Sequence, residues 1–211
     1  MKPLFKYFFL KSLFAFVVTF FLFSVIRTWY VRKNRVKTSL KREILIRIFT
    51  SYLAVLSVLL FTSNAKISSM GINLTSANFD FVGNFKDRMS DGAWGVNFYP
   101  FRTMKSYIKY SGFSHTLVNI LGNIVIFLPF GILVPEISKR FRKLSKLFLL
   151  ALLTSFFIEF TQFFIGRSVD IDDVILNVTG GVIGFLIWRK FLSEDGKKKS
   201  KKRKVNRFKR H

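Results

Sequence analysis

Two asparagines, Asn119 and Asn123, stand four residues apart in an otherwise apolar stretch at residues 116–135. Residues four apart share one face of a helix, so these amides form a line with His115. Comparable polar groups occur in two later apolar stretches, which carry Glu159, Gln162 and Asn177. An amide or carboxyl group buried in hydrocarbon without a partner is costly. The pattern therefore predicts a polar site inside a membrane bundle.

Glu159 is a functional candidate because a carboxylate within a membrane span is costly unless it is neutral or paired. The nearest cation after it in the sequence is Arg167. The intramembrane amides have an alternative, structural role, in which their hydrogen bonds tie helices together. Both interpretations stay open for Asn119, Asn123 and Asn177.

The short connection at residues 166–173 adds an arginine and three aspartates close to the same region. An aspartate at the start of a helix can instead cap the exposed amides, and we expect this role for at least one of Asp172 and Asp173. The predicted binding site comprises Asn119, Asn123, Glu159, Gln162, Arg167, Asp170, Asp173 and Asn177.

Five apolar stretches predict an all-α, polytopic bundle of transmembrane helices, since about 20 residues of helix cross a hydrocarbon core of ~30 Å. Half of the 211 residues are hydrophobic, yet the net charge is +24, so basic segments must separate the apolar ones. The first stretch is too long for a secretory signal and lacks a small-residue cleavage site. The five predicted spans are residues 7–26, 44–62, 116–135, 144–165 and 174–192.

Loop charge predicts that the amino terminus lies outside and the carboxyl terminus inside. Residues 27–42 hold seven Lys and Arg, residues 139–146 hold five, and residues 166–173 hold one. The 63–115 loop then faces outward. Residues 191–211 form a polybasic tail, predicted to be disordered and cytoplasmic; we interpret it as a membrane anchor rather than a nucleic-acid binder.

Smaller patterns indicate how the helices pack. Gly180, Gly181 and Gly184 include a small-x-x-x-small pair that permits close approach of two helices. Pro129 should bend or open its helix, and Pro135 should mark its end. Apolar and basic residues alternate at helical spacing in residues 101–109, which suits a short helix in the membrane interface, although a solvated turn is the alternative.

Taken in order, these motifs resemble the VanZ-like family of bacterial membrane proteins, named after a teicoplanin-resistance protein. The matching pieces are Asn-Phe-Tyr-Pro-Phe at 97–101, the 119–135 run, Glu-Phe-Thr-Gln at 159–162, the 167–173 segment, Asn177 and the glycines at 180–184. They place a VanZ-like domain at about residues 44–190. Residues 1–43 then form an extra span with a basic loop.

The resemblance implies a multi-pass protein of the bacterial plasma membrane that lowers sensitivity to teicoplanin, a lipoglycopeptide. We therefore expect partners among membrane lipids, lipoglycopeptides and lipid-linked cell-wall precursors, and no nucleic acid. The alternative is an enzyme acting on a lipid-linked substrate, with Glu159 or Asp170 as catalytic candidates and a divalent cation held by Asp170 or Asp173. No motif supplies a nucleophile or a phosphate-binding loop, and His115 alone is a weak basis for metal chemistry, so we assign no metal or cofactor.

Overall fold

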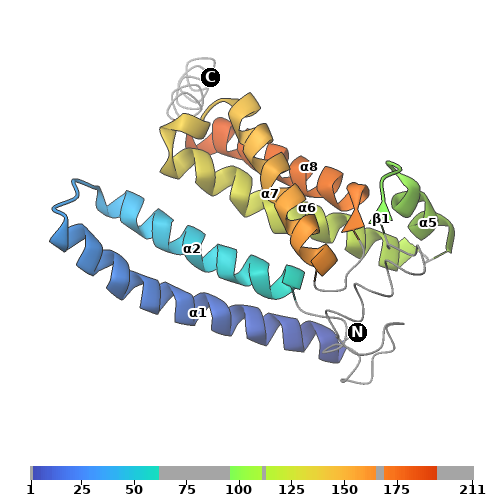
Figure 1. Cartoon of the computed structure of the whole chain (residues 1–211), viewed down its shortest axis with the longest axis horizontal. Coiled ribbons are helices and arrows are strands. Elements are labelled where there is room, and N and C mark those ends of the chain that lie inside the picture. Colours follow the sequence, from blue (N-terminus) through green and yellow to red (C-terminus); the bar gives the residue numbers. More distant parts are fainter. Residues whose placement is uncertain (1, 62–95, 111–112, 165–168, 194–211) are drawn as a thin grey trace, which may run out of the picture.

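Five long apolar helices dominate the computed structural model, which describes residues 2–61, 96–110, 113–164 and 169–193 (Figure 1). Each is long enough, and apolar enough, to cross a membrane. The five spans predicted from the sequence are therefore confirmed as candidate spans, whereas their orientation stays a prediction. The helices are α1 (Lys2–Lys33), α2 (Leu40–Phe61), α6 (Phe113–Ile137), α7 (Leu144–Phe164) and α8 (Ile171–Ile187).

Successive long helices run in opposite directions (Figure 1). The two ends of the bundle differ in the charged residues that they hold, and we name them the acidic end and the basic end. The acidic end holds the carboxyl ends of α2 and α7, the amino ends of α6 and α8, and the carboxylates Glu159, Asp170, Asp172 and Asp173. The basic end holds the α1–α2 connection, the 3₁₀ helix η1 (Lys139–Phe141) and the π-helical segment η2 (Trp188–Leu192). Most of the predicted outward loop and residues 194–211 of the tail lie outside the described residues.

Helices α6 and α8 approach each other closely because glycines line their contact. A Cβ atom added to Gly180 would lie 2.2 Å from the carbonyl oxygen of Ile124, and one added to Gly184 would lie 2.3 Å from that of Leu128. Such separations leave no room for a side chain. The packing role predicted for these glycines is therefore confirmed.

Helix α6 continues through both of its prolines, and Pro135 lies two residues before the helix ends at Ile137. Pro129 cannot donate a backbone hydrogen bond, which weakens the helix one turn earlier. In that turn, the hydroxyl of Tyr52 from α2 donates to the carbonyl oxygen of Ile126 at 2.8 Å. A side chain from a neighbouring helix thus supports the backbone next to the proline.

A short helix and a two-stranded sheet complete the acidic end (Figure 1). Helix α5 (Arg102–Tyr110) confirms the short helix expected near residues 101–109, rather than a turn. Strand β1 (Val96–Asn97) pairs in parallel with β2 (Val169–Asp170), which leads directly into α8. The sheet therefore fixes the segment before α5 to the amino end of α8.

Candidate functional site

Asp170 lies at the junction where β2 becomes α8. Its backbone is extended and its carboxylate accepts the amide of Asp172 at 2.9 Å, which makes Asp170 the N-cap of the helix. The side chain of Asn97 donates to the same carboxylate oxygen at 3.1 Å and to the hydroxyl of Thr103 at 3.0 Å. Asp170, a predicted binding and catalytic candidate, therefore connects β1, α5 and α8.

Asp172 caps a different helix from the one expected. Its carboxylate accepts the backbone amides of Phe101, of Thr103 at 2.9 Å and of Met104 at 3.0 Å, which belong to the first turn of α5 and the residue before it. The side chain is only 1 % exposed. Phe101 has a φ of 64°, a left-handed conformation that costs an L-residue about 1–2 kcal/mol. Asp172 thus holds a strained backbone at the start of α5.

The expectation that Asp172 or Asp173 caps the last span is consequently wrong. The helix begins at Ile171 rather than at the predicted residue 174, so its N-cap falls on Asp170. The β1–β2 pairing is the physical reason, because it keeps Asp170 extended until the helix starts. It also brings the amides of α5 within reach of Asp172.

Glu159, near the end of α7, is 3 % exposed. Its Oε2 atom accepts the backbone amide of Asp170 at 3.0 Å. The carboxyl group therefore joins α7 to the start of α8. Its predicted partner Arg167 lies outside the described residues.

Asn123 and Asp173 join α6 to α8. The side-chain amide of Asn123 donates to the Asp173 carboxylate at 2.6 Å, and both residues are half-buried. Unlike Asp170 and Asp172, this pair is partly accessible from outside the bundle. Among the predicted binding residues whose side chains are described, this pair is the one that retains contact with solvent or lipid.

Two other predicted amides, Gln162 and Asn177, are buried between helices. Gln162 donates to the carbonyl oxygen of Leu60 at 3.0 Å, which fastens α7 to the last turn of α2. Asn177 donates to the hydroxyl of Ser155 on α7 at 3.0 Å, and its Oδ1 atom has no hydrogen-bond partner in the structure. The interhelical role considered for Asn177 is thereby observed.

One predicted amide cannot be placed in the site. The backbone of Asn119 belongs to α6, but its side chain lies outside the part that the structure describes. Among the described residues, no group of three or more His, Asp and Glu side chains is arranged to hold a metal ion. The carboxylates of Asp170 and Asp172 are directed instead at backbone amides and at Asn97.

A family model described as VanZ/LLP1 matches residues 8–193 of this sequence. The chain belongs to the VanZ/LLP1 family. The match includes most of α1, so the family region begins before residue 44, where the sequence motifs place it. No curated protein and no solved structure matches this VanZ/LLP1 chain.

Sequence reasoning missed two residues of the VanZ/LLP1 site. Asn97 opens the Asn-Phe-Tyr-Pro-Phe motif, but its contact with Asp170 spans 73 positions and leaves no local pattern. Ser155 could have been found, since it stands four residues before Glu159 and so shares its helical face. Ser155 is fully buried, as expected for a hydroxyl in an apolar span that forms a hydrogen bond with a neighbouring helix.

Proposed function

We propose that this VanZ/LLP1 protein lowers the sensitivity of a bacterial cell to teicoplanin-type lipoglycopeptides. In this proposal it lies in the plasma membrane with its acidic end outward. A polar site at that end binds the lipoglycopeptide or a lipid-linked cell-wall precursor. The observation that carries the proposal is the half-buried Asn123–Asp173 contact, which remains accessible among carboxylates that are otherwise enclosed.

The acidic end, which carries the pair, also carries apolar groups that suit a ligand with a polar head and a lipid tail. Phe98, Tyr99 and Phe101 stand on the β1–α5 connection with 73 %, 71 % and 52 % of their surface exposed. Exposed aromatic side chains of this kind favour the membrane interface and offer apolar contacts to an acyl chain. The amide and carboxylate supply hydrogen bonds for the polar part.

The remaining polar residues position this surface in our proposal. Asp172 fixes the start of α5, and Asp170 fixes the strand before it through Asn97. Glu159 anchors the same junction from α7. Buried groups that are hydrogen-bonded in this way make a surface rigid, and a preorganised surface binds at lower entropic cost.

The test expresses the chain in a glycopeptide-sensitive bacterium and compares the growth-inhibiting concentrations of teicoplanin and of a glycopeptide without a lipid tail. We expect the unaltered chain to raise the teicoplanin value selectively. Asn123→Ala and Asp173→Asn should abolish the rise at unchanged membrane abundance. Asn34→Ala is the matched control, because it removes the same side chain at the basic end.

Two results would contradict the proposal in different ways. If the unaltered chain is abundant and changes neither value, the teicoplanin phenotype does not belong to this protein. If Asn123→Ala is abundant and fully protective, the phenotype stands but the Asn123–Asp173 pair is not its site. Measuring abundance separates both results from loss of folding.

A further inference from the structure

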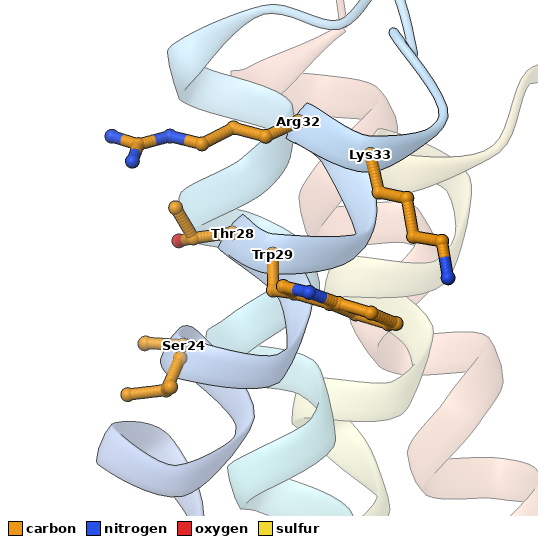
Figure 2. Close-up of a pocket in the computed structure, with 6 residues that line it drawn as sticks. Ser24, Thr28, Trp29, Arg32 and Lys33 are labelled. Atoms are coloured by element: carbon orange, nitrogen blue, oxygen red, sulfur yellow. The ribbon is translucent and has the colours of Figure 1, made fainter.

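A surface hollow of about 760 Å³ lies on α1 (Figure 2). It is near the basic end, whereas the carboxylate cluster lies at the acidic end. It is lined by Ser24, Val25, Thr28, Trp29, Arg32 and Lys33. These residues are four apart in two adjacent rows of the helix. Each row ends in a cation, Arg32 in one and Lys33 in the other. The hollow is therefore apolar or hydroxyl-lined toward the middle of α1 and positive at its end.

In the part of the chain that the structure describes, no carboxylate pairs with Arg32 or Lys33, so both cations are available to a ligand. Glu43 is the only Asp or Glu in the first 61 residues, and Arg27 occupies it through contacts of 2.8 and 3.0 Å. Arg32 makes no ion pair with any residue in the described ranges. The amine of Lys33 lies 4.6 Å from the centre of the Trp29 ring. No carboxylate of the described residues thus compensates the charge at the hollow.

The side of α1 below the hollow is apolar and open. Phe14, Phe21, Leu22 and Val25 each expose between 62 % and 71 % of their surface. In the described residues α1 packs chiefly against α2, so this stripe faces away from the bundle. Such a stripe can accommodate an acyl chain over its length. Trp29 lies between the stripe and the two cations, where indole rings favour the boundary of the hydrocarbon.

We propose that this hollow binds an anionic phospholipid. Arg32 and Lys33 contact the phosphate, the Trp29 ring lies beside the glycerol region, and one acyl chain follows Val25, Leu22 and Phe21. The arrangement of charge, aromatic ring and apolar stripe matches the order of headgroup, glycerol and acyl chain in such a lipid. Loop charge places the basic end toward the cytoplasm, whose leaflet is rich in anionic lipid. The inference does not depend on the function proposed above.

The experiment titrates the purified full chain in detergent with dioleoyl-phosphatidylglycerol or dioleoyl-phosphatidylcholine and follows the melting temperature. Because the acyl chains are identical, any difference comes from the headgroup. The anionic lipid should raise the melting temperature at lower concentration than the zwitterionic one. The apparent affinity for it should fall about thirtyfold in the Arg32→Gln/Lys33→Gln double variant, as expected for two cations beside an anionic group.

The matched control is Lys139→Gln/Arg140→Gln, which removes two exposed cations from η1 at the same end of the bundle. We expect it to bind the anionic lipid like the unaltered chain. An equal loss of affinity for the anionic lipid in both double variants would mean that total charge, and not the hollow, determines binding. That result would overturn the proposal. Equal affinity of the unaltered chain for the two lipids would overturn it as well.

A second measurement covers the case in which the double variant does not fold. Brominated acyl chains quench tryptophan fluorescence at contact, so the quenching that disappears in Trp29→Phe reports lipid at the hollow. The quenching that is lost in Trp29→Phe should be larger with brominated phosphatidylglycerol than with brominated phosphatidylcholine. Equal quenching by the two lipids would contradict a site for an anionic headgroup.

Discussion

Two buried carboxylates of this protein, Asp172 and Glu159, accept hydrogen bonds from backbone amides. Asp172 accepts three of them from the start of α5, and Glu159 accepts one from Asp170. Hydrogen bonds to a charged acceptor are worth about 1.5–3 kcal/mol each, roughly twice a neutral one. These side chains therefore fix the backbone of segments that have little apolar surface of their own.

Asp172→Asn should release α5 while the five long helices stay folded. The amide can offer one oxygen, but its NH₂ group must then face backbone amides, and the loss of the cap should cost about 0.5–2 kcal/mol. Arg102, Lys105 and Lys109 lie within α5, so its release should expose them to trypsin in reconstituted vesicles. Mass spectrometry of the fragments gives the readout.

Asp173→Asn serves as the control for this prediction. It removes the same charge one residue later, but the Asp173 carboxylate accepts a hydrogen bond from Asn123 of α6. We expect α5 to stay protected in this variant. Equal cleavage in both variants would mean that overall charge, and not the cap, holds α5.

Glu159→Gln and Glu159→Leu should differ in stability. Glutamine keeps an oxygen for the amide of Asp170, whereas leucine leaves that buried amide without its acceptor, which costs about 1–3 kcal/mol. The leucine variant should therefore melt at the lower temperature in detergent. Thr161→Val, an isosteric change on the same helix, is the control. A leucine variant as stable as the glutamine variant would show that Glu159 does not support the junction.

At the scale of helices, the close contact between α6 and α8 makes Gly180 irreplaceable. Gly180→Ala places a methyl group against the Ile124 carbonyl, so the helices must separate, at a cost of about 1–3 kcal/mol or more. Gly122→Ala is the matched control, because no atom lies within 4 Å of its added Cβ. Alanine should stabilise that position by about 0.5–1 kcal/mol. Melting temperatures in detergent should move in opposite directions.

The helices and the glycine contact could be predicted from the sequence because their signals are local. Apolar length indicates a span, and glycines four apart indicate a close approach. The capping of α5 by Asp172 could not be predicted, because the carboxylate and the amides that it accepts are about 70 residues apart in the sequence. That contact depends on the two-residue pairing of β1 with β2, which is too short to leave a periodic pattern.

At the scale of the whole molecule, the two ends differ in charge, and this asymmetry should set the orientation. Lys and Arg concentrate at the basic end, whereas four carboxylates gather at the acidic end. Basic residues in short loops are retained in the cytoplasm. The acidic end, with the proposed site, is then expected to face outward.

Cysteine labelling tests this orientation directly, because the chain contains no cysteine of its own. Tyr99→Cys marks the acidic end and Arg140→Cys marks the basic end, and both native side chains are exposed. An impermeant maleimide should label only Tyr99→Cys in intact cells, and both variants after permeabilisation. Labelling of Arg140→Cys alone in intact cells would reverse the assignment.

The parallel pairing of β1 with β2 also sets an order of events during synthesis. Residues 96–104 leave the ribosome well before their partners Asp170 and Asp172, whose separation from them is about 70 positions. Until α8 is made, the amides at the start of α5 have no carboxylate to accept them. The acidic end therefore cannot be completed before the start of α8 is made, and a chain that stops before residue 170 should insert four helices but leave this end unfinished.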